Sequence, residues 1–261
     1  MNAPLSFRFL PCLFFVFNLA IHAAVVTTPV EYTTGGITCE GLHVVDHSKS
    51  GKLPSVLIIH QWTGVSENEK MRAKMLAELG YNVFVADIYG KGIRPQPPEA
   101  GKEAGQYKID RKLYRERLLA GLDQLRKTSQ ADTTQVVAIG YCFGGTGVLE
   151  LARSGAVVKG VVSFHGGLDS PAPADGKNIK GKVLALHGAD DPFVPAKDLA
   201  AFEQEMKDAG VDYKLVQYPG AVHAFTQKAA GNDTSKGAAY NEAADKASWE
   251  EMKAFFDRLF K

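Results

Sequence analysis

A cysteine flanked by glycines stands where an apolar run ends and a helical pattern begins. Cys142 is the third residue of GYCFG, directly after the apolar run 136–139. This spacing is typical of a nucleophile elbow, in which a strained turn between strand and helix lifts the reactive side chain above the sheet. The following helix N-terminus favours the thiolate, and the backbone N–H of Phe143 would face a substrate carbonyl as an oxyanion donor. We therefore predict that Cys142 is a nucleophile; the alternative is a small buried cysteine in a glycine-rich turn.

A cysteine nucleophile requires a histidine base and an acid that orients the histidine. His223 follows one strand-like run, and Asp190 and Asp191 follow the preceding one. Both loops would lie at the carboxyl edge of a parallel sheet, together with Cys142. Because the order nucleophile, acid, histidine fits this architecture, we predict a triad of Cys142, Asp191 and His223. Asp190 is the rival acid, or a carboxylate that stabilises its own loop.

Three further histidines, His60, His165 and His187, also end strand-like runs. Histidines that converge on one sheet edge could form a metal site. Metal ligands, however, usually show close paired spacing or a partnering set of carboxylates, and this pattern lacks both. We therefore interpret them as buried, hydrogen-bonded histidines beside the site and expect no metal ion.

Apolar runs that alternate with helical patterns must position these residues. The runs cover 56–59, 83–86, 136–139, 161–164, 183–186 and 214–218. Continuously apolar strands are typical of a parallel sheet that helices cover on both faces. An alternating stretch at 31–46 predicts an antiparallel hairpin before them. We therefore predict one α/β domain over residues 24–261, with a mostly parallel doubly wound sheet and an antiparallel N-terminal hairpin.

Three segments carry apolar residues at helical spacing, and we expect each of these faces to pack on the sheet. They are Met71, Met75 and Leu79; Leu118, Leu122 and Leu125; and Trp249, Met252, Phe256 and Leu259. Segment 111–127 mixes acidic residues with its Lys and Arg residues. We interpret those charges as a solvated helix face.

Residues 1–23 have the layout of a secretory signal peptide. Arg8 precedes a short apolar run at 10–21, and small residues follow at 23–24. The run is short for a transmembrane helix; the alternative is a buried N-terminal helix. We predict cleavage after Ala23, export to the periplasm or outside the cell, and no membrane association of the mature chain.

Composition and charge restrict the class of protein and the kinds of binding partner. The chain of 261 residues is 45% hydrophobic and 23% charged, which excludes disordered, collagen-like and disulfide-stapled classes. Thirty Lys+Arg against 29 Asp+Glu argue against nucleic acid as the main partner.

Cys12 lies in the predicted signal peptide. A disulfide between Cys39 and Cys142 would consume the predicted nucleophile, so we do not expect one. We expect a monomer that acts on a small molecule.

The GYCFGG turn, the DDPFVP loop and the YPGAVHAF loop, in this order, resemble the dienelactone hydrolase family. The resemblance runs from the hairpin at 31–46 to the C-terminal helix. It implies an α/β-hydrolase fold and cleavage of a small ester or lactone through an acyl-enzyme, without a cofactor. By motif position it implies Cys142, Asp191 and His223 as the triad. It also implies that the backbone N–H of Trp62 is a second oxyanion donor.

The chain departs from that family's founding enzyme at charged positions. Gln61 stands where the founding enzyme has a glutamate that tunes the cysteine. The two arginines that grip the substrate carboxylate there correspond to Lys91 and Gln227, and Arg94, close in sequence, could substitute for the charge that is lost. We expect Gln61 and Lys91 to contact the substrate, and we regard dienelactone itself as disfavoured.

Two other functions are compatible with parts of the pattern. A secreted, non-catalytic binding protein could keep the same fold, and Gln61 is the feature that favours it. A glutamine-amidotransferase-like cysteine hydrolase would need a carboxylate closely after the histidine, whereas Ala-Phe-Thr follows His223.

Overall fold

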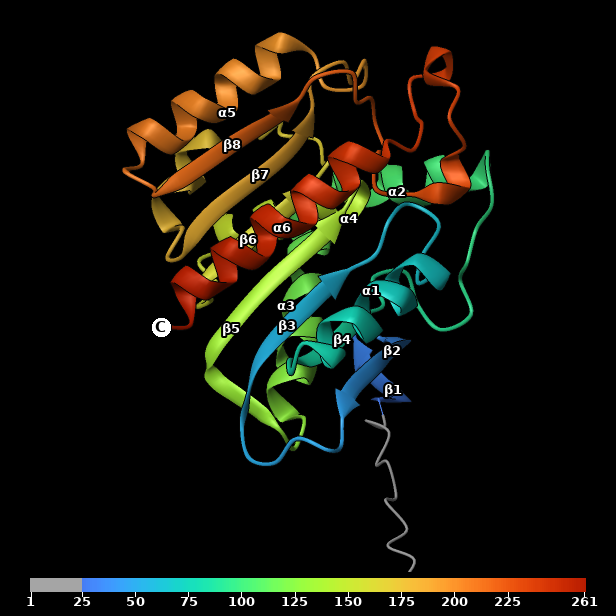
Figure 1. Cartoon of the computed structure of the whole chain (residues 1–261), viewed down its shortest axis with the longest axis vertical. Helices are drawn as coiled ribbons and strands as arrows, with labels where there is room; N and C mark the ends of the chain where they lie inside the picture. The colour runs from blue at the N-terminus through green and yellow to red at the C-terminus, as the bar shows by residue number, and fades with distance from the viewer. Residues whose placement is uncertain (1–24) are drawn as a thin grey trace, which may run out of the picture.

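Eight strands form one sheet in the order β1-β2-β4-β3-β5-β6-β7-β8 in the computed structural model, which describes residues 25–261 (Figure 1). The strands are β1 (Val25–Thr34), β2 (Ile37–Asp46), β3 (Leu53–Ile59), β4 (Asn82–Ala86), β5 (Ala131–Tyr141), β6 (Gly160–Phe164), β7 (Lys182–Gly188) and β8 (Tyr213–Tyr218). β2 pairs antiparallel with β1 and β4, and the other neighbours pair parallel. The predicted fold and N-terminal hairpin are confirmed. The predicted signal peptide and Cys12 lie outside the described residues.

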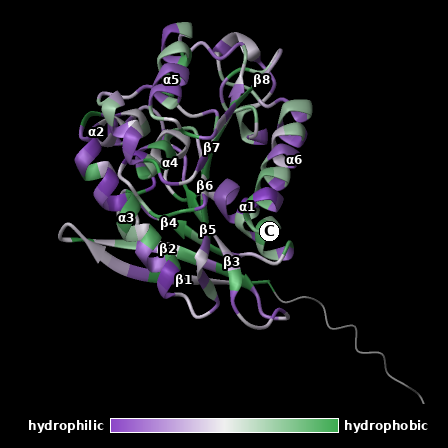
Figure 2. Cartoon of the chain, turned by 90° about the vertical axis from the view of Figure 1, so that its left-hand side faces the viewer, coloured by the Kyte–Doolittle hydropathy of each residue, from purple (hydrophilic) through white to green (hydrophobic). Residues whose placement is uncertain are grey.

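Two layers of helices cover the sheet. The helices are α1 (Glu67–Glu78), α2 (Glu99–Ile109), α3 (Arg111–Lys127), α4 (Phe143–Arg153), α5 (Ala196–Asp208) and α6 (Glu242–Leu259). α1 and α6 pack on one face, and α3, α4 and α5 pack on the other (Figure 1). Figure 2 shows the hydrophobic strands between helices whose outer surfaces are hydrophilic. Because both faces are covered, the central strands are buried along their whole apolar runs, as predicted.

The leucine face of α3 and most of the apolar face of α6 are buried, as their spacing predicts. The prediction for α1 is wrong, because Met71 and Leu79 are 43% and 51% exposed. α1 instead packs on the sheet through Ala73, Leu76 and Ala77. Two residues along a helix turn about 200° around its axis, so Met71 lies opposite Ala73. The two small alanines let the helix lie close to the sheet.

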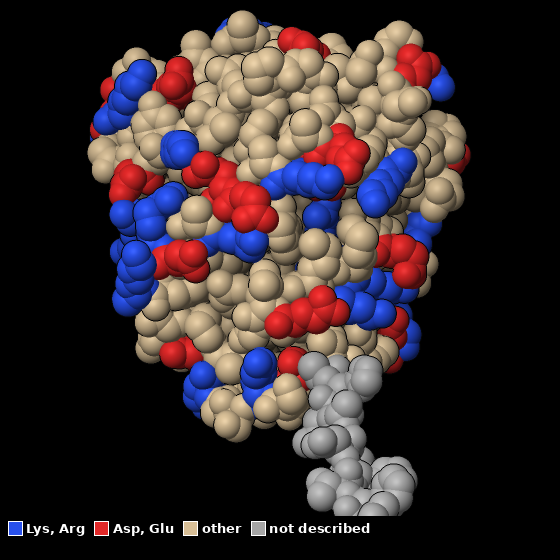
Figure 3. Space-filling view, viewed as in Figure 1, with Lys and Arg blue, Asp and Glu red and all other residues tan. Residues whose placement is uncertain are grey.

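Two of the charged residues of α3 differ from the prediction of a solvated face. Arg111 and Arg117 are both buried. Arg117 donates to the backbone carbonyl of Thr34, and Arg111 pairs with Asp169 at 2.7 Å. These acceptors replace part of the water that each guanidinium group loses on burial. Elsewhere charges of both signs lie side by side on the surface, as Figure 3 shows for one face.

A buried ion cluster joins α4 to α5. The fully buried guanidinium of Arg153 donates to Glu205 at 2.8 and 2.7 Å and to Glu150 at 3.0 Å. Arg115 donates to the second oxygen of Glu150 at 2.9 Å. Because each carboxylate has a guanidinium partner, the cluster can lie in the interior without an unpaired charge.

Among the described helices, none is long and apolar enough to cross a membrane.

Candidate active site

Cys142 occupies a strained turn between β5 and α4. Its backbone dihedral angles are φ 54° and ψ −114°, a conformation that non-glycine residues rarely adopt. Glycines make the turn possible. A Cβ atom on Gly140 would lie 2.0 Å from the carbonyl oxygen of Gly144, and one on Gly144 would lie 2.2 Å from that of Ile59. The strand–turn–helix geometry expected around Cys142 is therefore present, with β3 directly beside the turn.

The three side chains of the predicted triad form a hydrogen-bonded chain. The Nε2 atom of His223 lies 3.0 Å from the Sγ atom of Cys142, and its Nδ1 atom lies 2.8 Å from Oδ2 of Asp191. Asp190 instead accepts the backbone N–H of Gly220 at 3.1 Å. The structure therefore places Asp191, and not its rival Asp190, on the imidazole of His223.

The electrostatics of the chain favour a thiolate beside an imidazolium. Burial raises the pKa of Cys142. His223, the Lys108 ammonium and the backbone N–H of Phe143 together lower it by more, so that the pKa lies below its ordinary value. Burial lowers the pKa of His223, but Cys142 and Asp191 outweigh it and raise that pKa to about 10. The two shifts share one cause, which is the mutual stabilisation of opposite charges. The partner histidine thus favours the thiolate form of Cys142.

His165 contacts the backbone of Cys142, whereas His223 contacts its sulfur. The N–H of Cys142 is shared between the Phe164 carbonyl at 3.0 Å and Nδ1 of His165 at 3.2 Å. Because Nδ1 accepts, Nε2 carries the proton and donates to the hydroxyl of Thr226 at 2.8 Å. Burial holds the pKa of His165 well below its ordinary value, and the nearby His223 adds to this effect. His165 is therefore neutral. The sequence predicted a buried, hydrogen-bonded histidine but gave no sign of its contact with the Cys142 backbone.

The two predicted oxyanion donors lie on adjoining segments. Phe143 is the first residue of α4, and its ring stacks on that of Tyr114 with 4.6 Å between the ring centroids. The hydroxyl of Tyr114 donates to the Phe143 carbonyl at 2.8 Å and holds the first turn of the helix. Trp62 lies in the loop after β3, where its carbonyl accepts the hydroxyl of Tyr89 at 2.9 Å. Tyr89 also packs against Phe143, so one aromatic cluster supports both segments.

Gln61 and Gln227, from loops distant in sequence, meet in a neutral pair. The amide nitrogen of Gln227 donates to Oε1 of Gln61, whose own amide donates to the hydroxyl of Ser66 at 3.3 Å. Neither glutamine can take or release a proton in the ordinary pH range. The two positions therefore contribute hydrogen-bonding groups without charge.

The two cations expected near the substrate are engaged by carboxylates. The ammonium of Lys91 binds Glu31 and Glu40 of the N-terminal hairpin. Arg94 donates to the buried Asp87 at 3.4 Å and to backbone carbonyls. These contacts place the Lys91 ammonium on the hairpin, and its role as a substrate contact stays a prediction.

Phe193 is a site residue that the sequence did not indicate. Its ring packs edge-on against the imidazole of His223, with 5.4 Å between the ring centroids, although the residue is 60% exposed. A phenylalanine is ordinarily expected in the core, so the residue type of Phe193 gave no sign that it lies exposed beside His223. Its place two residues after Asp191 in the DDPFVP loop was the available signal. Phe193 presents an apolar surface beside the imidazole of His223.

Metal and disulfide chemistry find no support among the described residues. In residues 25–261, no group of three or more His, Cys, Asp or Glu side chains is arranged to hold a metal ion. Cys39 and Cys142 are both free thiols.

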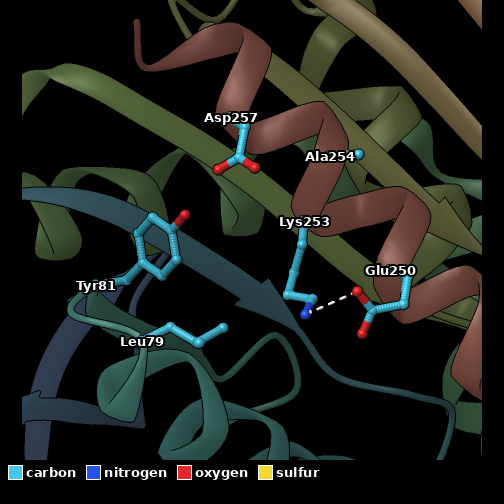
Figure 4. A pocket seen from close by; sticks show the side chains of 6 residues that line it. All are labelled: Leu79, Tyr81, Glu250, Lys253, Ala254 and Asp257. Atoms are coloured by element: carbon cyan, nitrogen blue, oxygen red, sulfur yellow. Dashed lines mark ion pairs between the residues drawn. The ribbon is translucent and has the colours of Figure 1, made fainter.

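A surface hollow of about 310 Å³ lies between α6 and the turn after α1 (Figure 4). It is lined by Leu79, Tyr81, Glu250, Lys253, Ala254 and Asp257, of which Glu250 and Lys253 form an ion pair. The hollow contains none of the triad residues. The placement of the candidate site therefore rests on the side-chain geometry around Cys142.

The chain is similar to known proteins over most of its length. The family model described as "Dienelactone hydrolase family" matches residues 40–260. A protein of Synechocystis sp. named carboxymethylenebutenolidase is 26% identical over 226 residues, which cover 81% of this chain and 88% of that protein. A Bradyrhizobium protein named as a 2-oxo-3-(5-oxofuran-2-ylidene)propanoate lactonase is 28% identical over 187 residues, with 67% and 75% covered. The crystal structure of a dienelactone hydrolase-like promiscuous phosphotriesterase from metagenomic libraries is 36% identical, with a TM-score of 0.86 over 90% of this chain and 99% of that chain.

Proposed function

Because the chain belongs to the dienelactone hydrolase family, whose members hydrolyse small esters or lactones, we propose that it does so through a Cys142–Asp191–His223 triad and an acyl-enzyme. One observation carries this proposal. The imidazole of His223 lies between the Sγ atom of Cys142 at 3.0 Å and the carboxylate of Asp191 at 2.8 Å. That arrangement is the one in which a histidine can share a proton with a nucleophile while an acid fixes its tautomer.

Acylation begins with the ion pair. The thiolate of Cys142 attacks the carbonyl carbon of the ester, and the electron pair of the C=O bond moves to the oxygen. The backbone N–H groups of Phe143 and Trp62 stabilise this oxyanion, and loss of one such donor typically costs about 3 kcal/mol. The tetrahedral intermediate collapses, the bond to the alkoxy oxygen breaks, and the imidazolium of His223 gives its Nε2 proton to the leaving alkoxide. For a lactone, the alkoxide stays attached to the acyl chain.

Deacylation uses the same groups in reverse roles. Neutral His223 takes a proton from water at Nε2, and the hydroxide attacks the thioester carbon. The second tetrahedral intermediate collapses with cleavage of the C–S bond and releases the carboxylic acid product and the Cys142 thiolate. Throughout both steps, Asp191 accepts the Nδ1–H of His223 and keeps Nε2 directed at the sulfur. The net reaction consumes one water and needs no cofactor.

We propose that the substrate is small and carries no charged group that the site must neutralise. The neutral pair of Gln61 and Gln227 offers hydrogen bonds without charge. Phe193 adds an apolar surface beside His223. The ammonium of Lys91 is paired with carboxylates of the hairpin. An uncharged ester or lactone is therefore favoured over one with a free carboxylate.

Turnover of an activated aryl ester by the wild type and by Cys142→Ala tests the proposed function. We expect hydrolysis by the wild type and a loss to background in the variant. Full turnover by the variant would contradict the nucleophilic role of Cys142. If a panel of esters and lactones gives no turnover and the thiol alkylates slowly, the alternative of a non-catalytic binding protein is favoured instead.

We also propose that the protein is exported, on the basis of the sequence of residues 1–23. Expression of the full chain in a bacterial host, followed by the intact mass of the product in each cell fraction, tests this. A periplasmic or secreted product that begins at Ala24 is expected. A full-length product that stays in the cytoplasm would contradict export.

A further inference from the structure

His60 is a buried histidine that the proposed triad does not use. It follows the last residue of β3 and is completely inaccessible to solvent. Its Nδ1 atom lies 2.6 Å from the carbonyl oxygen of Gln61, and its Nε2 atom lies 3.1 Å from the backbone nitrogen of Ile88. Both ring nitrogens are therefore engaged by backbone groups of the segments that follow β3 and β4.

These two partners fix the tautomer of His60. A backbone N–H can only donate, so Nε2 of His60 accepts from Ile88 and carries no proton. A backbone carbonyl can only accept, so Nδ1 carries the proton and donates it to Gln61. Burial lowers the pKa of His60 to about 4, so that the ring stays neutral near pH 7. His60 is thus a permanent donor to the Gln61 carbonyl.

The Gln61 carbonyl sets the direction of the next N–H group. In a trans peptide the C=O of one residue and the N–H of the next point to opposite sides. His60 and the N–H of Gly64, at 3.1 Å, both bind the Gln61 carbonyl. The N–H of Trp62 must therefore point away from them. The carbonyl of Trp62 is held in turn by Tyr89, so both peptide planes around this residue are fixed.

The end of β3 lies against the turn that carries the nucleophile. A Cβ atom on Gly144 would lie 2.2 Å from the carbonyl oxygen of Ile59 and 2.6 Å from that of His60. The His60 ring also stacks on the ring of Phe143 at 5.8 Å, with an angle of 20° between the planes. His60 therefore contacts the residue of one expected oxyanion donor and orients the peptide of the other.

We propose that His60 is a positioning residue for the oxyanion hole: its Nδ1–H holds the Gln61–Trp62 peptide so that the Trp62 N–H faces the oxygen of the tetrahedral intermediate. This inference rests on the proposed acyl-enzyme mechanism. His60 touches neither the substrate nor the sulfur, so it acts on the reaction through Trp62. Its loss should slow attack on a carbonyl and leave the reactivity of the thiolate unchanged.

Two amide variants separate the two hydrogen bonds of His60. The side-chain amide of His60→Asn can reach the position of Nδ1 and donate to Gln61. The amide of His60→Gln reaches the position of Nε2 and can accept from Ile88. We expect His60→Gln to lower kcat/KM for an aryl ester about 10²-fold, the usual effect of one lost oxyanion donor, and His60→Asn to retain most of the activity. His43→Gln, on β2 and bonded to Asn82, is the matched control with unchanged activity.

Alkylation of Cys142 by iodoacetamide is the second readout, because attack on its saturated carbon forms no oxyanion. Wild-type alkylation rates in His60→Gln, together with slow ester hydrolysis, would support the proposal. Equal losses in both reactions, or unchanged hydrolysis in His60→Gln, would overturn it. If the wild type itself forms no acyl-enzyme, the proposed function fails rather than the role of His60.

The tautomer can be measured on the wild type, independently of whether the variants fold. ¹⁵N NMR of the histidine rings should show His60 as a neutral ring with its proton on Nδ1 at pH 7. A proton on Nε2, or a charged ring, would overturn the proposal.

Discussion

The Nε2 atom of His223 lies 3.0 Å from the Sγ atom of Cys142, although 81 residues separate them in the chain. Cys142 follows β5 and His223 follows β8, and the parallel sheet brings both strand ends to one edge. The contact lowers the pKa of the thiol and raises that of the imidazole. The contact therefore favours the thiolate form of the proposed nucleophile before any substrate arrives.

The ionisation of Cys142 should depend on His223. In the wild type, the rate of iodoacetamide alkylation should stay high as the pH falls below the ordinary pKa of a cysteine thiol, since the imidazolium favours the thiolate. Substitution His223→Gln removes that cation and leaves the burial, so the thiol pKa should rise. The alkylation rate at pH 7 should then fall more than about tenfold, which corresponds to one pKa unit. An alkylation profile unchanged from the wild type would show that His223 does not ionise the thiol.

The two neighbouring aspartates should differ sharply in their effect. In a serine triad, replacement of the acid by its amide lowers kcat by about 10⁴. We expect Asp191→Asn to lower kcat by about 10²- to 10⁴-fold, because the amide no longer fixes the tautomer of His223. Asp190→Asn, the matched control, should stay within about threefold, because its carboxylate binds only its own loop. Comparable losses in both variants would contradict the assignment of Asp191.

The role of Lys91 can be decided with a pair of substrates that differ in one carboxylate. Kinetics of Lys91→Ala on p-nitrophenyl butyrate and on mono-p-nitrophenyl succinate make this comparison. Because Glu31 and Glu40 engage the ammonium, we expect KM for both esters to change by less than about twofold. A selective rise of KM for the succinate ester would instead show that Lys91 leaves these partners and binds substrate.

The buried cluster around Arg153 should matter for stability. Arg153→Met leaves the buried carboxylate of Glu205 without a partner and that of Glu150 with Arg115 alone, which should cost about 3–5 kcal/mol in free energy of unfolding. Urea denaturation monitored by circular dichroism measures this loss. Arg126→Met, which removes a partly exposed pair with Asp123, is the control and should cost less than about 1 kcal/mol. Equal stability of the two variants would contradict the assigned role of the cluster.

The strands and the turn at Cys142 could be predicted from the sequence, because their signals are local. Each apolar run became a strand, and the glycines around Cys142 mark a place where no side chain fits. Helix faces were less predictable. The face of α1 with Met71 looked like core, but the alanine face packs closer to the sheet. Local hydrophobicity does not report which of two faces allows the closer approach.

Contacts that depend on tertiary structure could not be predicted from residue types. Histidine identity alone did not reveal that His165 accepts the N–H of Cys142 or that His60 donates to Gln61. The pairing of Lys91 with the hairpin also depends on tertiary structure, since Glu31 lies 60 residues away in the chain. The expected positions followed from sequence motifs, whereas the partners of each side chain follow from the way distant segments meet.

The acyl-enzyme is the central claim, and intact mass after a short pulse of p-nitrophenyl acetate tests it most directly. Freshly reduced protein and Cys142→Ala are mixed with the ester, quenched in acid and compared, with peptide mapping to locate the added group. We predict a gain of one acetyl group on Cys142 of the wild type, with turnover, and neither acetylation nor turnover in the variant. Turnover by Cys142→Ala, or an acetyl group on another residue of an active wild type, would contradict the account.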